Sequence, residues 1–152
     1  MRYAFAKDCI TPKLGTRLAG FNRTIPVQGV LDDLFLQVLL IEDKNQQQFL
    51  LISGDIIGFE SSFVKKMRRF VNKKYPQVSE SAVCFNATHT HGGPATIYFV
   101  EAIGAYDKSY MNFLEKKLKL LIEEVISAKM KNAEISGGNG QCELSVNRRL
   151  PT

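Results

Sequence analysis

Apolar residues recur along this chain at two spacings, and the two spacings predict its secondary structure. Short apolar runs of strand length cover residues 3–6, 34–42, 48–53 and 82–86. A polar turn at residues 44–46 separates the second run from the third and predicts a hairpin. The two strands joined by this hairpin are therefore expected to be antiparallel.

Two longer segments have apolar residues at helical spacing. The first is expected to begin near Ser61 or Ser62, either of which can cap it, and to end before Pro76. The second covers residues 107–131, and its apolar side is formed by Leu114, Leu118, Leu121 and Val125. After it, residues 133–146 have the pattern of β structure interrupted by glycines.

This succession of strands and helices predicts one α/β domain over residues 1–152. The expected order is three strands, a helix, a strand, a helix and a final β segment. Alternating strands and helices are typical of a layered α/β fold, here a mixed β-sheet with flanking helices. Asp55 and His89 follow two of the strands, and α/β sheets place ligands beyond the carboxyl ends of strands.

Composition narrows the class of protein. The chain has 45% hydrophobic and 23% charged residues, which is typical of a globular protein and excludes general disorder. No apolar run approaches the length of a membrane span. The three cysteines are far apart in sequence, so they indicate neither a disulfide framework nor a cysteine zinc site. The N-terminus lacks an apolar core of signal-peptide length, which favours a cytoplasmic protein, with secretion as the alternative.

Positive charge is concentrated in the first predicted helix. The net charge is +5, and six basic residues lie in this segment: Lys65, Lys66, Arg68, Arg69, Lys73 and Lys74. They fall mainly opposite the apolar side, so we interpret them as a solvated helix face. The alternative is a nucleic-acid patch, but no aromatic platform or recognition motif accompanies it. No nucleic-acid partner is therefore expected.

The chain's two histidines lie two positions apart, as His89 and His91 within the run Thr88-His89-Thr90-His91. In an extended backbone, residues i and i+2 point to the same side, so both imidazoles could reach one site. Imidazole is a preferred zinc ligand, although a catalytic zinc site uses three protein ligands. A hydrogen-bonded pair of loop histidines is the alternative.

Other polar residues could join such a site. Asp55 could ligate a metal or orient a ligating histidine, while a turn-forming aspartate is the structural alternative. Arg148 and Arg149 offer donors for a carbonyl or an oxyanion, although an arginine pair near a terminus is commonly a surface feature. The glycine-rich stretch at residues 137–140 lacks the lysine of a phosphate loop, so we interpret it as a turn or bulge.

Three segments together resemble the N-terminal part of the neutral/alkaline non-lysosomal ceramidase family. They are Asp8-Cys9-Ile10-Thr11-Pro12 with Leu18-Ala19-Gly20-Phe21, then Asn86-Ala87-Thr88-His89-Thr90-His91-Gly92-Gly93-Pro94, and last Ser145-Val146-Asn147-Arg148-Arg149. Gly54-Asp55 after a strand also fits related bacterial members. The resemblance extends along essentially the whole chain.

The resemblance implies a zinc amidase that hydrolyses the N-acyl bond of ceramide or a related N-acyl substrate. It assigns His89 as a zinc ligand and places His91 beside the metal, in contact with the substrate. Arg148 and Asn147 of the last motif, together with Gly20, are expected at the substrate. A lipid substrate leaves peripheral membrane contact open. In this mechanism zinc-activated water attacks the amide, and His91 passes a proton to the leaving amine.

The sequence departs from this family in two respects. The family motif reads T-H-T-H-S-G-P, and here Gly92 stands in place of the serine. Family members are also much longer, and their remaining ligands (a second histidine, a glutamate and a tyrosine) lie downstream. We therefore expect a truncated chain. The alternative function is a non-catalytic, metal-binding remnant or module of such an enzyme.

Overall fold

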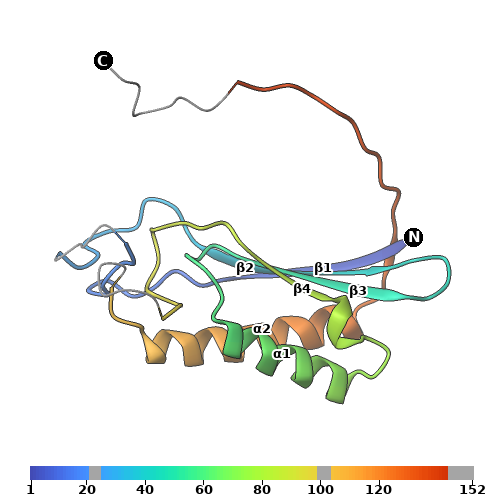
Figure 1. Ribbon diagram of the computed structural model, residues 1–152, viewed down its shortest axis with the longest axis horizontal. Helices are drawn as coiled ribbons and strands as arrows, with labels where there is room; N and C mark the ends of the chain where they lie inside the picture. Colours follow the sequence, from blue (N-terminus) through green and yellow to red (C-terminus); the bar gives the residue numbers. More distant parts are fainter. Residues whose placement is uncertain (21–24, 99–103, 144–152) are drawn as a thin grey trace.

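The computed structural model describes residues 1–20, 25–98 and 104–143 and contains the expected mixed sheet (Figure 1). Its strands are β1 (Arg2–Cys9), β2 (Phe35–Glu42), β3 (Gln48–Gly54), β4 (Val83–Ala87) and β5 (Lys131–Asn132). They are ordered β4-β3-β2-β1-β5, with β3 and β4 parallel and the other neighbours antiparallel. The predicted fold class, a mixed sheet with helices, and the antiparallel pairing of the predicted hairpin are confirmed.

Two helices follow the predicted apolar spacing. Helix α1 (Ser61–Lys74) precedes the 3-10 turn η1 (Glu80–Ala82), and α2 (Lys108–Ser127) follows β4. The prediction of a serine cap was wrong, because Glu60 is the N-cap of α1 and its side chain makes no capping hydrogen bond. Asp107 caps α2 and accepts a hydrogen bond from the Tyr110 backbone N–H at 2.9 Å.

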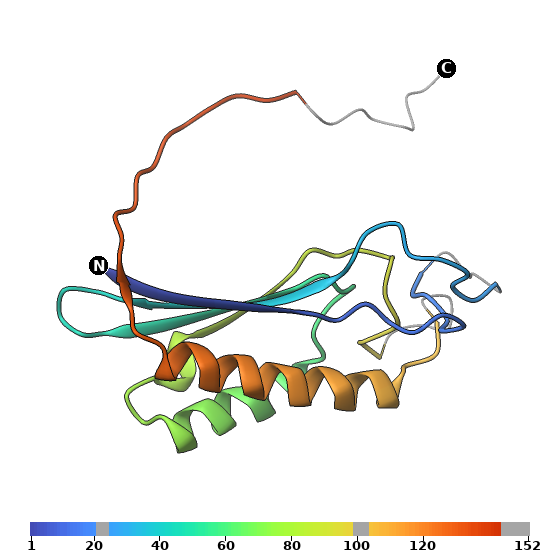
Figure 2. The same ribbon diagram turned by 180° about the vertical axis from the view of Figure 1, so that it is seen from behind.

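Both helices lie side by side on one face of the sheet (Figures 1 and 2). Lys66 pairs with Glu115 at 2.6 Å and Lys74 pairs with Glu123, so ion pairs connect the two helices. The main core fills the space between them and the strands, with residues such as Leu36, Val38, Leu50, Met67 and Leu118. No helix in the described ranges has the length and apolarity needed to cross a membrane.

A buried tyrosine connects α2 to the end of β1. The Tyr110 hydroxyl donates a hydrogen bond to the Ile10 carbonyl at 2.6 Å. Burial raises the pKa of Tyr110 above its usual range, so the hydroxyl keeps the proton that it donates. This bond fixes the chain where β1 passes into the long loop that carries Gly20.

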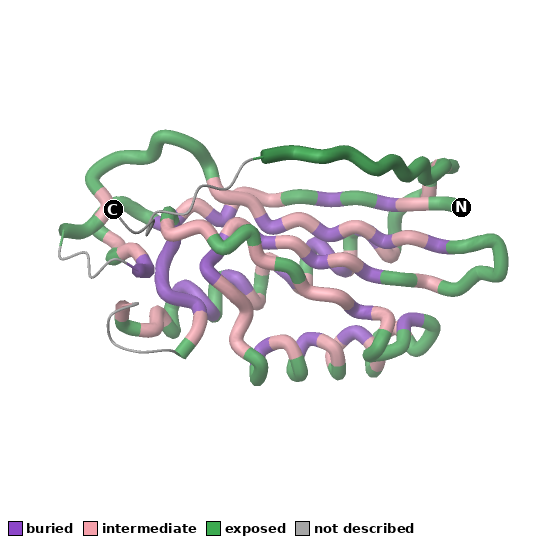
Figure 3. The backbone as a smooth tube through the Cα atoms, turned by 45° about the horizontal axis from the view of Figure 1, so that its top comes forward, coloured by how far each residue is buried: buried purple, intermediate pink, exposed green. Residues whose placement is uncertain are grey.

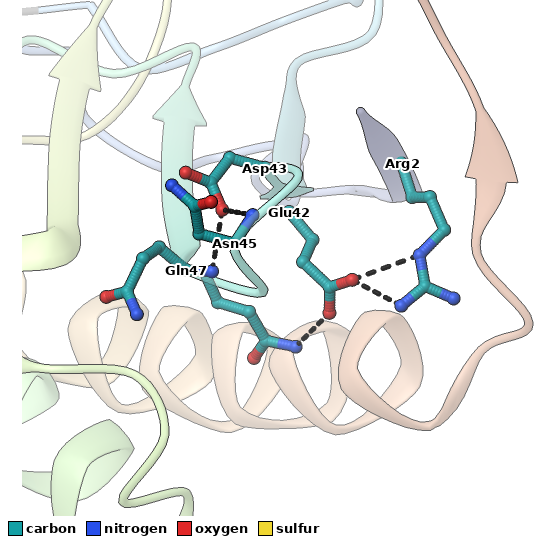
Figure 4. Close-up of polar contacts among 6 residues, drawn as sticks. Arg2, Glu42, Asp43, Asn45 and Gln47 are labelled. Atoms are coloured by element: carbon teal, nitrogen blue, oxygen red, sulfur yellow. Dashed lines mark hydrogen bonds and ion pairs between the residues drawn. The ribbon is translucent and has the colours of Figure 1, made fainter.

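The hairpin between β2 and β3 has the predicted turn (Figure 4). The Asp43 carboxylate accepts backbone hydrogen bonds from Asn45 and Gln47, both at 2.8 Å. This is the local bonding that makes aspartate a turn residue. Beside it, the buried Glu42 carboxylate accepts from Arg2 Nε and from Gln48, both at 3.0 Å, which satisfies the charge at this end of the sheet.

The prediction of β structure over residues 133–146 was wrong for residues 133–143, the part of this segment that the structure describes. Strand β5 ends at Asn132, and residues 133–143 have no regular secondary structure, while 144–146 lie outside the described part. Residues 134–143 are exposed and run on the side of the sheet away from the helices (Figures 1 and 3). The four glycine and asparagine residues at 137–140 have low strand propensity, which explains the difference.

The two sheet faces should differ in their contribution to stability. Leu50 is fully buried under the helices, whereas the next residue, Leu51, faces the opposite side and is half-buried. We expect Leu50→Ala to lower the free energy of unfolding by about 2–5 kcal/mol, because it leaves a cavity in the core. Leu51→Ala should lower it by roughly 1 kcal/mol. Urea denaturation followed by circular dichroism measures both, and equal losses would contradict this account of the core.

Candidate functional site

Three loops meet beyond the carboxyl ends of β3 and β4. Because these strands are parallel and Gly54 pairs with Ala87, the residues that follow each strand emerge at the same edge of the sheet. The Thr88 N–H donates to the Gly54 carbonyl at 3.1 Å, which continues the pairing past the strand ends. The Ala19 N–H donates to the Gly93 carbonyl at 2.8 Å and brings in the third loop.

A small apolar cluster holds these loops together. It contains the buried side chains of Ala19, Ile57 and Ala95, with Ile97 packed against them, and it is separate from the main core. Each of the three loops supplies at least one member. The cluster therefore fixes the backbones from which Gly20, His89 and His91 extend.

His89 has a strained backbone and a defined imidazole orientation. Its φ is +60°, in the left-handed region that non-glycine residues rarely adopt. Its Nδ1 lies 2.8 Å from the Ile57 carbonyl oxygen. A carbonyl can only accept, so Nδ1 carries the hydrogen and the lone pair of the neutral ring is on Nε2. Histidines that bind metals commonly donate their other ring nitrogen to such a carbonyl or carboxylate.

His91 lies against His89, although the left-handed backbone at His89 is not the extended conformation on which the two-residue spacing argument relied. The ring centroids are 5.3 Å apart with an interplanar angle of 87°. Gly20 lies directly against the His91 ring, since a Cβ built on this glycine would be 1.8 Å from His91 Nδ1. Gly20 also has a φ of +81°, so glycine is required there for both conformation and space. The structure thus brings together Gly20, His89 and His91.

Asp55 directly follows β3 at the same edge of the sheet, and its carboxylate forms a hydrogen bond to the backbone. Its Oδ2 accepts a hydrogen bond from the Phe35 N–H at 2.9 Å, and its own N–H donates to the Phe35 carbonyl at 2.9 Å. These bonds support the turn-aspartate alternative. They leave Oδ1 as the oxygen with which Asp55 could act as a ligand, so the metal role stays a prediction.

Some predicted site residues lie outside the described part of the chain. Asn147 and Arg148 fall in residues 144–152, so their predicted roles are untested. Within the described ranges, no group of three or more His, Cys, Asp or Glu side chains is arranged to hold a metal ion.

The Ile57 carbonyl is a site component that sequence reasoning missed. A backbone carbonyl has no signature in the sequence, and Ile57 itself looks like an ordinary core residue. The one available signal was Gly58, which follows Ile57 and marks a loop directly after the strand.

An apolar cavity of about 290 Å³ lies beside the histidine loop. Thr90 and Gly92 of that loop form one side of it. The remaining lining is mainly aliphatic, and its apolar members are Pro12, Leu18, Val27, Val30, Leu31 and Leu34. Leu31 is 97% exposed and Val30 is 50% exposed, so apolar surface at the cavity is open to solvent. Thr11, Gly29 and Asp32 complete the lining, so the cavity suits a mainly apolar group.

Comparison with known proteins identifies a related fold. The solved structures that are similar to the chain include a ceramidase complexed with C2 and the neutral ceramidase from Pseudomonas aeruginosa. Each has a TM-score of 0.72 and 18% sequence identity over 86% of this chain. The chain spans 21% and 22% of their respective lengths. No protein-family model and no curated protein matches the sequence. The fold expected from the resemblance is therefore confirmed.

The contact between Gly20 and His91 can be tested against a matched glycine. Gly15 has a similar φ of +84°, but a Cβ there would have no neighbour within 4 Å. Gly15→Ala should lower the free energy of unfolding by about 1–2 kcal/mol through backbone strain alone. Gly20→Ala should cost roughly 1–3 kcal/mol more, because its methyl group overlaps the imidazole.

Urea denaturation of both variants measures this difference. Adding His91→Ala to Gly20→Ala should remove most of the excess, because it deletes the overlapping ring. If Gly20→Ala and Gly15→Ala were equally destabilising, Gly20 would not lie against His91.

The strain at His89 predicts an unusual order of stability. His89→Gly and His89→Ala both remove the imidazole, but glycine accepts a positive φ and alanine does not. We expect the glycine variant to be more stable by about 1 kcal/mol. Thr90, whose φ is not positive, serves as the control, and there the alanine variant should be the more stable. Thermal unfolding measures both pairs, and the same order at both positions would refute the strain.

Proposed function

We propose that this chain forms part of the active site of a zinc-dependent amidohydrolase that cleaves the N-acyl bond of ceramide or a related lipid-like amide. The hydrogen bond from His89 Nδ1 to the Ile57 carbonyl carries this proposal. This bond leaves a lone pair on Nε2, which is the atom that could bind a metal. His89 lies just after a parallel strand, in a fold similar to that of neutral ceramidases. Because the chain spans about a fifth of those proteins, the activity of the whole enzyme is part of the proposal.

His89 would hold the metal through Nε2, and Asp55 would contribute Oδ1 as a second ligand. The chemistry of this pair fits zinc, which accepts imidazole nitrogen and carboxylate oxygen. A catalytic zinc ion has three protein ligands, so at least one more donor is required. When bound, zinc supplies Lewis-acid activation of water for attack on an amide carbonyl.

The remaining predicted residues would act on the substrate. His91 lies beside His89 and would donate a proton to the departing amine, which otherwise leaves as an unstable anion. Arg148 would stabilise the negative charge that develops on the carbonyl oxygen, and Asn147 would contact the substrate next to it. Gly20 would meet the substrate through its backbone, and its lack of a side chain leaves room for the His91 ring that lies against it.

The apolar cavity supports a lipid-like substrate. It adjoins the histidine loop through Thr90 and Gly92, and its walls are mainly aliphatic. A hydrocarbon chain bound there would cover side chains such as Leu31 that are otherwise exposed. We therefore propose that part of the substrate is a hydrocarbon chain, with the amide directed toward the histidines.

Zinc content and amide hydrolysis, measured together, test this function. A full-length protein that contains this chain is purified, loaded with zinc and analysed for bound metal, then incubated with a fluorescent N-acylsphingosine while the released fatty acid is quantified. We expect zinc-dependent release that falls by at least about a hundredfold in His89→Ala, since loss of a ligand removes the metal. Lys73→Ala, on the exposed side of α1, is the control and should retain full activity.

Each result distinguishes the proposal from its alternative. Undiminished hydrolysis in His89→Ala would refute the role of this histidine. Stoichiometric zinc without turnover would instead support the non-catalytic, metal-binding module. Hydrolysis that does not depend on zinc would contradict both.

A further inference from the structure

A buried hydroxyl group lies next to the loop that orients His89. Thr96 has no exposed surface, and its Oγ1 donates a hydrogen bond to the Gly58 carbonyl at 2.6 Å. In the described part of the chain, only Thr96 and Glu42 are buried polar or charged residues. Glu42 forms the ion pair at the far end of β2. A buried hydroxyl costs free energy unless it is bonded, so the position of Thr96 requires an explanation.

Gly58 directly follows the residue whose carbonyl fixes the His89 ring. Residues 55–60 belong to no strand or helix, so no regular ladder determines where the Ile57 carbonyl points. The Ile57 side chain is held in the small apolar cluster. The bond from Thr96 to Gly58 restrains the next peptide unit, and the two contacts together leave the Ile57 carbonyl little freedom.

Thr96 is itself attached to a fixed part of the molecule. The Asp107 N–H donates to the Ala95 carbonyl at 3.0 Å, which connects this segment to the beginning of α2. On the other side, the Tyr98 N–H donates to the Glu60 carboxylate at 3.1 Å. The hydroxyl of Thr96 therefore connects the segment bonded to α2 with the 55–60 loop and restrains the position of that loop. The Glu60 bond does not involve Thr96, so it would still hold the two segments together if the hydroxyl were removed.

We propose that Thr96 is a positioning residue that sets the tautomer of His89. Through the Gly58 peptide it holds the Ile57 carbonyl where it accepts the Nδ1 hydrogen, which keeps the Nε2 lone pair available. This inference deepens the proposed function, because a histidine that binds zinc through Nε2 carries its hydrogen on Nδ1. The tautomer itself is a property of the metal-free protein and can be measured separately from zinc binding or hydrolysis.

Nuclear magnetic resonance of the two imidazoles tests the proposal directly. The metal-free protein is labelled with ¹⁵N at histidine and studied at about pH 8.5, where an ordinary histidine is neutral. The chain has two histidines, so a His91→Gln variant assigns the signals. In the wild type we expect His89 to be mainly the Nδ1–H form.

Two substitutions separate the hydroxyl from the shape of Thr96. Thr96→Val keeps the volume but removes the donor, and we expect the Nε2–H fraction of His89 to rise several-fold. Thr96→Ser keeps the donor and should preserve the wild-type tautomer. Thr96→Ala provides a second hydroxyl-free variant without added bulk, in case the valine variant fails to fold. Circular dichroism confirms that the compared variants are folded.

Three results would overturn the proposal. They are an Nε2–H tautomer of His89 in the wild type, an unchanged tautomer in the folded hydroxyl-free variants, and an equal change in Thr96→Ser and Thr96→Val. The last result would assign the effect to side-chain packing at this position and not to the hydroxyl group. A role of Thr96 in stability alone would change the unfolding free energy of these variants but leave the tautomer as it is.

Discussion

The candidate site depends on the hydrogen bond between His89 Nδ1 and the Ile57 carbonyl. This bond decides which ring nitrogen carries the hydrogen and therefore which one can bind another group. It also links the loop after β4 to the loop after β3, so the imidazole is positioned by two elements. His89 adopts a left-handed backbone to make this contact, and such strain persists only when the surroundings hold it in place.

The surroundings that hold His89 come from the topology of the sheet. Parallel pairing of β3 and β4 brings the residues after both strands to one edge, although they are more than thirty positions apart in sequence. The long loop after β1 reaches the same edge because Ala19 bonds to Gly93. The small cluster of Ala19, Ile57 and Ala95 then packs the three loops together. Alanine suits positions 19 and 95 because the backbones of these loops approach closely.

The main core and the candidate site lie in different parts of this fold. The helices and the main core cover one face along the full length of α1 and α2 (Figure 2). The histidine loop lies beyond the strand ends and has its own small cluster. Strain at His89 and close contact at Gly20 can therefore be tolerated, because the main core supplies most of the stability.

The sequence by itself determined most of the order of strands and helices, the hairpin turn at residues 44–46 and the grouping of the two histidines. These features follow from local spacing and turn chemistry, which act between neighbouring residues. Residues 133–143 are where this reasoning failed, because glycines break the strand pattern and nothing packs on it. Tertiary structure alone decided that Gly20 lies against His91, that Ile57 offers its carbonyl to His89 and that Thr96 lies buried behind them. These contacts join distant segments through backbone atoms and close packing, for which the order of side chains contains no local signal.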